Sequence, residues 1–322
     1  MIFQFKKTNE FSSQEIKEIC DLFFEVFKKE KTIVEFNKQF LNTILGYSYH
    51  GLLKNDENEI VGCYTSIPVK YHYYDKELIF ALSVDTMIKE EYRGNPFTLK
   101  KLSNLVYDSL KSDNVPFVFG FPNDNVYLVR QKILKWKDVG QLDYFILPIN
   151  IGAIKTNFKF LNPISKLFSK ILLSFIHINL IDSKKSKNIE KVTNSEFMNY
   201  RYSLLGGNYS IIDGKDNRLF DFIYKVEEYE NIKTAYIIDI NNLNKSRFDN
   251  AVKNIFKCEK DIDVILYVGK LDFKPKTLFK VPKKLIPKTV YMSGKVLDSS
   301  IISDDIYDIE NWNVNLSNLD VV

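Results

Sequence analysis

The chain has 322 residues, of which 45% are hydrophobic and 27% are charged, and this balance excludes a largely disordered protein. Its formal net charge of +4 is too small a surplus over this length to indicate nucleic acid as a partner. The three cysteines and three histidines are scattered singly, which argues against a disulfide framework and leaves no metal-ligand spacing. We therefore expect no metal.

The N-terminus and the apolar runs bear on localisation. The chain begins MIFQFKKTNEF, without the positive region and apolar stretch of a signal peptide. The most apolar run, residues 171–181, is far shorter than the ~20 residues that a membrane-spanning helix needs. We expect a soluble, cytoplasmic protein with no membrane span.

Hydrophobic periodicity predicts an ordered series of elements in the first half of the chain. In chain order these are helix, helix, three strands, helix, strand, helix and strand, at residues 12–29, 33–45, 47–54, 60–73, 77–88, 96–110, 117–121, 123–134 and 139–147. Short polar turns join the three strands, so we expect an antiparallel meander. The strand at 117–121 should run parallel to its predecessor, because a helix carries the chain across. The fold class is thus α/β (α+β) with a mixed sheet.

The middle of the chain differs in character from its flanks. It contains an amphipathic helix at 163–181 and then the basic loop 183–188. We interpret this stretch as the connection between two domains; alternatively, the apolar face of the helix lies on a membrane surface. From residue 194 onward, strands, a helix and further strands repeat the order of the first half. The predicted organisation is a first domain at 1–150, a connection at 151–190 and a second domain at 191–322.

The run 84–99 (VDTMIKEEYRGNPFTL) is the most informative stretch. It indicates a strand that stops at a charged turn, followed by a helix with proline at its first position. The first turn of such a helix offers unpaired backbone N–H groups to an anion. We therefore predict an anion-binding junction here.

Three local motifs accompany this order of elements. Residues 91–98 have the sequence EYRGNPFT, residues 120–125 have GFPNDN, and residues 133–136 have ILKW. Together they resemble the GNAT superfamily of acyl-CoA N-acyltransferases, and more closely its tandem-domain members. The resemblance implies two GNAT-like domains in tandem, of which the first binds acetyl-CoA or another acyl-CoA. The second would be degenerate, because no phosphate-binding turn is visible in it.

The resemblance also implies which residues hold the acyl-CoA. Backbone N–H groups of residues 94–99, helped by Arg93, would bind the pyrophosphate, and backbone groups near Met87–Lys89 would pair with the pantetheine amides. The splay between the fourth and fifth strands would receive the pantetheine arm and the thioester. Asn123 and Asn125 either contact the ligand or only cap their helix. The predicted acyl-CoA-binding residues are Met87, Ile88, Lys89, Arg93, Gly94, Asn95, Phe97, Thr98, Asn123 and Asn125.

Some positions depart from the family pattern. Pro96 removes one N–H donor, and Thr98 adds bulk where the phosphates would pass close to the backbone. The family's frequent general acid, a tyrosine, corresponds to Gln131, which cannot protonate a thiolate. Lys135 stands where the family has glycine. These changes would weaken or alter acyl-CoA binding and remove the usual acid.

Two other residues are candidates for the catalytic roles. Tyr127 lies one helical turn before Gln131 on roughly the same face, and it is either a proton donor or a half-buried aromatic. Asp85, on the long strand, is either the base for the amine or a partner of a neighbouring backbone group. Neither Cys20 nor Cys63 has a histidine partner evident from the sequence, so we expect no cysteine nucleophile.

The first hypothesis is an N-acyltransferase that moves an acetyl or other acyl group from acyl-CoA to a small-molecule amine acceptor. Amino sugars are one acceptor class that the resemblance implies. A second hypothesis is a catalytically degenerate GNAT-fold protein that binds a ligand or partner. A third is a peptidoglycan-type aminoacyl transferase, which also pairs two GNAT-like domains but takes its donor from aminoacyl-tRNA. The sequence predicts neither the acceptor nor the oligomeric state.

Overall fold

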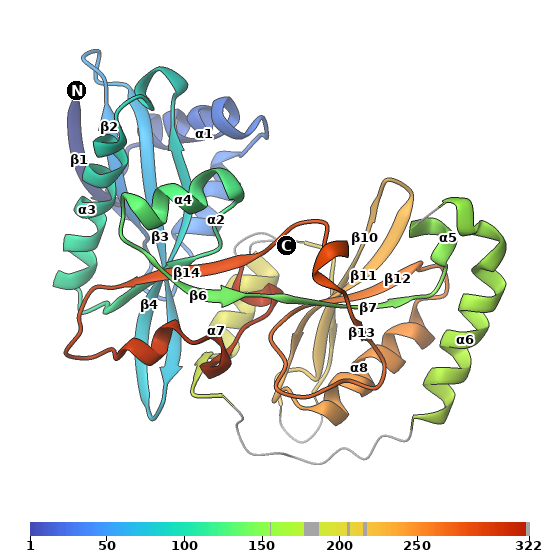
Figure 1. Ribbon diagram of the computed structural model, residues 1–322. Coiled ribbons are helices and arrows are strands. Elements are labelled where there is room, and N and C mark those ends of the chain that lie inside the picture. The colour runs from blue at the N-terminus through green and yellow to red at the C-terminus, as the bar shows by residue number, and fades with distance from the viewer. Residues whose placement is uncertain (155, 177–186, 205–206, 215–217, 320–322) are drawn as a thin grey trace. The chain divides into compact units, whose positions relative to one another are not determined.

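The computed structural model describes residues 1–154, 156–176, 187–204, 207–214 and 218–319 (Figure 1). The chain forms two compact units, each with its own sheet and hydrophobic core. Unit 1 comprises Met1–Gln141, Ile189–Gly207 and Val290–Asn311, and unit 2 comprises Leu142–Asn188, Asn208–Thr289 and Trp312–Val322. Both sheets contain parallel and antiparallel pairs, so the predicted mixed α/β fold class is confirmed.

The sheet of unit 1 has the strand order β1-β2-β3-β4-β5-β14-β6, with β8 beside β3. Its strands are β1 (Ile2–Lys7), β2 (Tyr49–Lys54), β3 (Ile60–Tyr73), β4 (Lys76–Ile88), β5 (Phe117–Gly120), β6 (Lys137–Gln141), β8 (Ile189–Lys191) and β14 (Tyr291–Val296). The meander of β2, β3 and β4 is antiparallel and β5 is parallel to β4, as predicted. Strand β1 was missed, because it is half-buried along most of its length and shows no clear alternation.

The helices of unit 1 begin at side chains suited to cap them. They are α1 (Ser13–Phe27), α2 (Ile33–Phe40), α3 (Pro96–Ser112), α4 (Asp124–Lys132) and α7 (Ser195–Met198), with a π-helical turn at Asn199–Leu204. Ser12 and Thr32 form capping boxes at the starts of α1 and α2. Asn95 and Asn123 cap α3 and α4, and both of these helix starts matter for the site described below.

Helices α2 and α3 cover opposite faces of the sheet. On β2, the ring of His50 lies against the aromatic rings of α2, 5.3 Å from that of Phe40. The next residue, Gly51, faces α3 so closely that a Cβ atom there would lie 2.4 Å from the carbonyl oxygen of Leu102. Successive residues of a strand point to opposite faces, so α2 and α3 lie on different sides of it. Only glycine permits this close approach of α3 to β2.

Unit 2 has a sheet of order β13-β7-β12-β11-β10-β9. Its strands are β7 (Asp143–Pro148), β9 (Tyr209–Ile212), β10 (Phe222–Tyr229), β11 (Ile232–Ile240), β12 (Val264–Gly269) and β13 (Phe279–Lys280). The short strand β15 (Trp312–Asn313), near the C-terminus, is not part of this sheet. Its helices are α5 (Ile151–Ile154), α6 (Asn162–Phe175) and α8 (Lys245–Cys258). Helix α8 joins the parallel strands β11 and β12, and its buried face completes the core.

Single-turn or two-turn 3-10 helices occur along both units. They are η1 (Thr8–Glu10), η2 (Glu90–Tyr92), η3 (Thr156–Leu161), η5 (Lys283–Leu285), η6 (Asp304–Tyr307), η7 (Ile309–Asn311) and η8 (Leu316–Asn318). Of these, η2 forms the turn between β4 and α3, where the sequence predicted the anion-binding junction.

The two units exchange segments along the chain. Strands β6 and β7 are separated only by Leu142, yet they belong to different sheets, whereas the sequence predicted one strand at 139–147. Strand β14, from the second half of the chain, returns to the sheet of unit 1 and lies between β5 and β6. Periodicity identifies strands but not their partners, so the predicted organisation, with its first domain at 1–150, does not contain this exchange.

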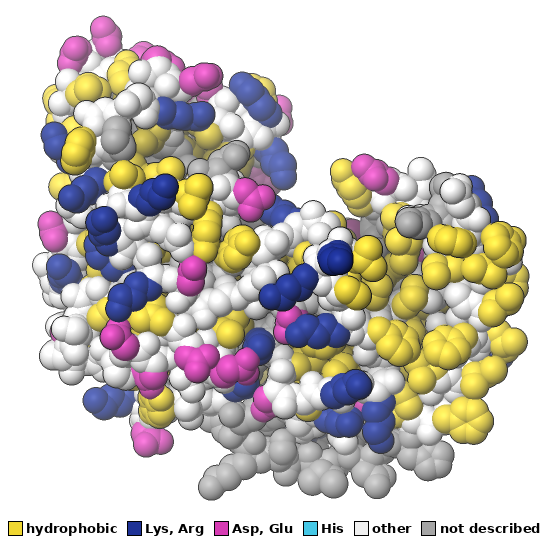
Figure 2. Space-filling view, viewed as in Figure 1, with side chains coloured by type: hydrophobic (Ala, Val, Ile, Leu, Met, Phe, Trp, Pro, Cys, Tyr) yellow, Lys and Arg dark blue, Asp and Glu magenta, His cyan; other side chains and the backbone are white. Residues whose placement is uncertain are grey.

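Helix α6 leaves most of its apolar side chains exposed. Ser169 and Leu173 are buried, whereas Ile164 and Phe175 are 64% and 79% exposed. Figure 2 shows hydrophobic side chains gathered over this helix. No helix in the described ranges is long and apolar enough to cross a membrane. The end of the predicted helix at 163–181 and most of the basic loop 183–188 lie outside the described residues.

Candidate functional site

A pocket of about 640 Å³ lies in unit 1, between the end of β4, the turn that follows it and the helices α3 and α4. Apolar side chains make up most of its lining, and most of them come from α1, α3 and α4. Its charged lining residues are Arg93 and Lys132, and no Asp or Glu of the described chain lines it. Such a lining suits a ligand with an apolar arm and an anionic end.

The pocket lies beyond the point where β4 and β5 cease to pair. They pair only at Ala81 with Val118 and at Leu82 with Phe119. Beyond these pairs, β4 carries a bulge in which Asp85 and Thr86 lie opposite a single residue of β3. Asp85 has a φ of +42°, and Thr86 lines the pocket. The splay that the sequence predicted between the fourth and fifth strands is therefore present.

The start of α3 offers fewer N–H donors than predicted. The side chain of Asn95 accepts a hydrogen bond from the N–H of Phe97 at 2.9 Å, and its carbonyl accepts from the N–H of Thr98 at 3.0 Å. Pro96 has no N–H to donate. Asn95 itself lines the pocket, so its side chain rather than the N–H groups of residues 97 and 98 faces a ligand there. Around Gly94, no other atom lies within 4 Å of the position of a Cβ atom, so packing does not require glycine.

Arg93 is the cation closest to this helix start along the chain. Its Nε donates to the carbonyl oxygen of Ile88 at 2.7 Å, and its side chain lines the pocket. Within the part of the chain that the structure describes, the two Nη atoms of Arg93 have no hydrogen-bond partner. They are available to bind an anion in the bidentate geometry that a guanidinium favours.

The strand end before the turn is already engaged in other contacts. The carbonyl of Ile88 accepts from Arg93, and the N–H of Lys89 donates to Val61 at 2.9 Å. A hydrogen bond to Glu25 raises the pKa of Lys89, whose ammonium lies 3.2 Å from that carboxylate. The side chain of Met87 is buried. Neither Met87 nor Lys89 lines the pocket, and of the three predicted residues only Ile88 does.

Helix α4 contributes its N-cap and one cation. The side chain of Asn123 accepts from the N–H of Val126 at 3.1 Å and also lines the pocket, so it both caps the helix and faces the cavity. Lys132 lines the pocket from the last turn of α4. The side chain of Asn125 lies outside what the structure describes.

Asp85 forms an ion pair with Lys31, from the loop between α1 and α2. The two side chains are only 14% and 11% exposed. Lys31 also donates to Gln39 at 2.7 Å and lies 4.0 Å from the centre of the Phe23 ring. Asp85 does not line the pocket. Sequence reasoning missed Lys31, because nothing local connects it to a strand 54 residues away.

Tyr127 points to a different neighbourhood. Its hydroxyl donates to Asp138 at 2.7 Å and accepts from the side chain of Gln131 at 2.9 Å, and its ring stacks on Tyr291. Burial and the hydrogen bond to Asp138 raise the pKa of Tyr127 to about 12. Neither Tyr127 nor Gln131 lines the pocket. The two positions considered for the acid thus belong to one hydrogen-bonded cluster on the other side of α4.

Cys63 does have a histidine neighbour, which the sequence did not reveal. Its Sγ lies 4.0 Å from Nδ1 of His50, on the adjacent strand. Both side chains are fully buried, and His50 is also held by Thr8 and Thr65 at 2.8 and 3.1 Å. Burial lowers the pKa of His50 to about 3 and raises the pKa of Cys63 to about 12. The pair is neutral and lacks the thiolate that a nucleophile needs.

One buried residue beside the pocket was not predicted at all. Arg130, on α4, is only 5% exposed. Its Nη2 donates to the hydroxyl of Ser83 on β4 at 3.2 Å, and its guanidinium lies 4.5 Å from the centre of the Trp136 ring. No motif in the sequence distinguishes this arginine from a solvent-exposed helix residue.

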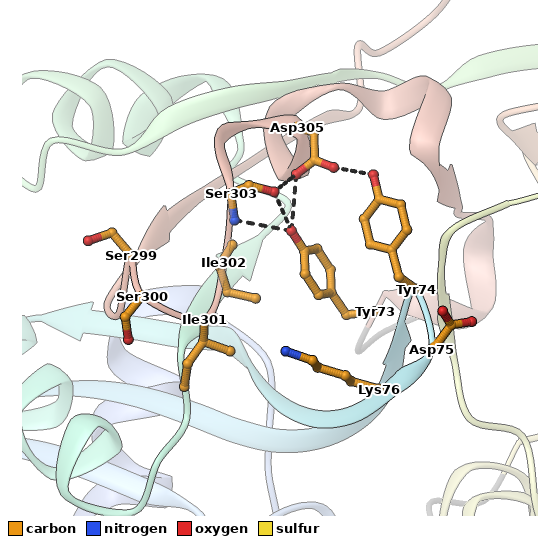
Figure 3. A pocket seen from close by; sticks show the side chains of 10 residues that line it. All are labelled: Tyr73, Tyr74, Asp75, Lys76, Ser299, Ser300, Ile301, Ile302, Ser303 and Asp305. Atoms are coloured by element: carbon orange, nitrogen blue, oxygen red, sulfur yellow. Dashed lines mark hydrogen bonds between the residues drawn. The ribbon is translucent and has the colours of Figure 1, made fainter.

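A second pocket in unit 1 lies between the β3–β4 hairpin and residues 299–305 (Figure 3). Its volume is about 370 Å³. The hydroxyl of Tyr73 lies 2.7 Å from that of Ser303 and donates to Asp305 at 3.0 Å, and Tyr74 also donates to Asp305. These polar groups form hydrogen bonds with one another, so they are less available to a ligand than the polar side chains of the first pocket.

Comparison with known proteins bears on the first pocket. Residues 7–130 match the family model of the acetyltransferase (GNAT) domain. This segment is a GNAT domain. It contains β4, the turn with Arg93, α3, β5 and most of α4, and therefore nearly the whole lining of the pocket. The family predicted from the sequence is thereby confirmed.

Solved structures extend the likeness beyond the GNAT domain. A conserved protein of unknown function from Enterococcus faecalis V583, described as a probable N-acyltransferase, is 13% identical with a TM-score of 0.59, over 92% of this chain and 72% of its own. A GCN5-related N-acetyltransferase from Anabaena variabilis ATCC 29413 is 11% identical with a TM-score of 0.58, over 92% and 73%. At these identities the likeness shows the fold alone. No curated protein sequence matches this chain significantly.

Proposed function

We propose that the GNAT domain transfers an acyl group from acyl-CoA to an amine of a small-molecule acceptor. The observation that carries the proposal is the pocket at the β4–β5 splay, which is apolar along α4, bears Arg93 and Lys132 and has no lining carboxylate among the described residues. An acyl-CoA has a long arm of low charge and an anionic phosphate end, and both match this lining.

The residues present can bind the phosphates, but through side-chain cations more than through backbone N–H groups. Because Pro96 and the Asn95 cap remove N–H donors at α3, the phosphates would depend on the guanidinium of Arg93 and the ammonium of Lys132. The positive ends of the dipoles of α3 and α4 add to this attraction. The thioester would lie in the splay, near Thr86 and the bulge.

The chemistry is direct attack of the amine on the thioester carbonyl. A C–N bond forms, the C–S bond breaks, the ammonium proton goes to a base, and the thiolate takes up a proton. Asp85 is the proposed base, and an incoming amine has to compete with Lys31 for its carboxylate. Asp85 does not line the pocket, but it directly precedes Thr86, which does. The hydroxyl of Tyr127 is bound to Asp138 on the other side of α4, so we base the proposal on Asp85 alone.

The alternative is a GNAT-fold protein that binds a ligand without transferring an acyl group. The occupied N–H groups of Phe97 and Thr98 and the ion-paired state of Asp85 favour it. Both functions predict CoA binding or a related ligand in the same pocket, and they differ in turnover.

Calorimetry with CoA and acetyl-CoA tests the binding site. We expect the protein to bind both ligands and Arg93→Ala to bind them at least about tenfold more weakly, because a hydrogen bond to a charged group contributes roughly 1.5–3 kcal/mol. Lys100→Ala is the matched control, since Lys100 is exposed on α3, the helix that follows the turn with Arg93, and does not line the pocket. The absence of heat from either ligand at millimolar concentration would contradict the proposal.

Release of free thiol from acetyl-CoA, followed with a panel of amines that includes amino sugars, tests the chemistry. We expect Asp85→Asn to lose turnover while it still binds CoA. If Asp85→Asn retains the full rate, Asp85 is not the base. If the protein binds acetyl-CoA but none of the amines in the panel leads to release of thiol, the ligand-binding alternative is the better description.

A further inference from the structure

Within the part of the chain that the structure describes, Arg130 is a buried cation without a counter-ion. Its side chain is 95% removed from solvent, and of its three nitrogens Nε and Nη1 are buried with no hydrogen-bond partner among the described residues. No Asp or Glu of the described chain forms an ion pair with it. Burying an unpaired charge costs folding free energy, and a buried ionisable group of this kind beside a cavity is a candidate for binding a ligand.

The groups around Arg130 are neutral. They are the hydroxyls of Ser83 and Thr86, the indole of Trp136 and the phenols of Tyr64 and Tyr107. Burial raises the pKa of Tyr107 well above its ordinary range, so this phenol does not ionise to balance the guanidinium. Among the residues that the structure describes, the guanidinium therefore has an aromatic ring and two hydroxyls beside it but no anionic partner.

The guanidinium lies where β4 and β5 diverge. Nη2 reaches Ser83 on β4, and a Cβ atom on Gly120 of β5 would come within 2.6 Å of Nη1. Thr86, whose hydroxyl is 3.5 Å from Nη2, is also a lining residue of the pocket. Arg130 thus adjoins the pocket at the splay, whereas Arg93 and Lys132 face it from the turn and from the end of α4.

We propose that Arg130 binds a carboxylate at the free end of the acyl group, so that the donor is an acyl-CoA whose acyl chain ends in a carboxylate. This inference rests on the proposed function, because it places the thioester arm of acyl-CoA in the splay. The carboxylate accepts charge-assisted hydrogen bonds from the guanidinium, and the hydroxyl of Thr86 is near enough to add another. A neutral acetyl group leaves the charge unpaired.

The test compares acyl-CoA pairs of matched length on the full chain. Malonyl-CoA is compared with butyryl-CoA, and succinyl-CoA with valeryl-CoA, by calorimetry and by competition against CoA. We expect at least one carboxylate-bearing ligand to bind about tenfold more tightly than its neutral counterpart. Arg130→Met, which keeps the volume and removes the charge, should bind both members of each pair equally. Lys132→Met should weaken all four ligands by the same factor and preserve the preference.

The outcomes separate the inference from the proposed function. If CoA binds but neither pair shows a preference, the inference fails and the proposed function stands. If no CoA ligand binds, both fail. A preference that survives in Arg130→Met would assign the carboxylate to another residue. If Arg130→Met loses affinity equally for acyl-CoA ligands with charged and with neutral acyl groups, Arg130 stabilises the thioester oxygen instead. The comparison in the unaltered protein needs no variant, so it decides even if Arg130→Met does not fold.

Discussion

Glu15 connects three elements of the GNAT domain through one carboxylate. Its Oε1 accepts from Lys6 on β1 at 2.8 Å and from Lys54 on β2 at 3.1 Å, and its Oε2 accepts from the N–H of Ser12 at 3.0 Å. Burial alone would raise the pKa of Glu15, but these hydrogen bonds outweigh it and lower the pKa to about 2. In the folded state, these hydrogen bonds therefore stabilise the ionised carboxylate of Glu15 more than its protonated form.

We predict that Glu15 makes the stability of unit 1 depend on pH in a defined window. Because its pKa falls from 4.5 to about 2 on folding, its contribution is present above pH 4.5 and is lost as the pH falls towards 2. Glu15→Gln should lower the free energy of unfolding at pH 7 by up to roughly 3 kcal/mol, and by much less at pH 2. Urea unfolding at a series of pH values measures both.

The matched control for this prediction is Glu57→Gln. Glu57 is exposed in the turn between β2 and β3, so its substitution should leave the pH profile parallel to that of the unaltered protein. The prediction would be contradicted if the free energies of unfolding of Glu15→Gln and the unaltered protein differed by the same amount from pH 7 to pH 2. Packing rather than ionisation would then explain the loss of stability.

The residues of the site were predictable where the chemistry is local. Arg93, Asn95 and Asn123 could be found because a turn residue and two N-caps are defined by a few positions along the chain, and all three line the pocket. Lys31 and Arg130 could not, since their roles come from side chains that other strands and loops bring near. Periodicity and motifs contain no information on such distant partners.

At the scale of the element, the end of α4 shows a local mismatch. The family pattern has glycine where this chain has Lys135, and Lys135 adopts a left-handed conformation with a φ of +59°. Across this turn the N–H of Trp136 donates to the carbonyl of Arg130 at 3.1 Å. The backbone of this turn thus has the left-handed conformation that glycine adopts freely, whereas lysine adopts it at a cost in free energy.

We predict that Lys135→Gly stabilises the GNAT domain. Removal of the Cβ strain should raise the free energy of unfolding by about 0.5–1 kcal/mol, after the greater flexibility of glycine in the unfolded chain is subtracted. Urea unfolding at neutral pH measures the change. Lys135→Ala removes the same charge but keeps the Cβ atom, so it should give no gain, and equal stabilisation by both variants would argue that charge is responsible.

Predictable elements were those with a strong internal pattern. The stripes of α1 and α3 and the long apolar strands β3 and β4 were found with close to the observed bounds. The half-buried β1 was missed, and one apolar run was interpreted as a single strand although it divides into β6 and β7. Both errors concern strands whose identity depends on a partner elsewhere in the chain.

At the scale of the molecule, the exchange of segments links the folding of unit 1 to residues near the C-terminus. Strand β14 pairs with β5 on one side and β6 on the other. Its Met292 is fully buried, and Gly294 lies so close to the ring of Phe117 that a Cβ atom would come within 2.4 Å of it. Without β14, two strand edges and the aromatic side chains beside them would be exposed.

We therefore predict that a fragment of residues 1–150 does not unfold cooperatively, although it contains the whole GNAT match at 7–130. In the sheet, Gln141 at the end of β6 is paired with Tyr291 at the start of β14. A fragment that joins residue 141 to residue 291 through an Asn-Gly turn, and ends at residue 311, restores β14 as one arm of a hairpin. It should show a single urea transition by circular dichroism, where 1–150 shows a broad loss of signal. If 1–150 unfolds with the same midpoint and slope as the joined fragment, then β14 contributes little to the fold, and the GNAT domain is independent of the C-terminal half.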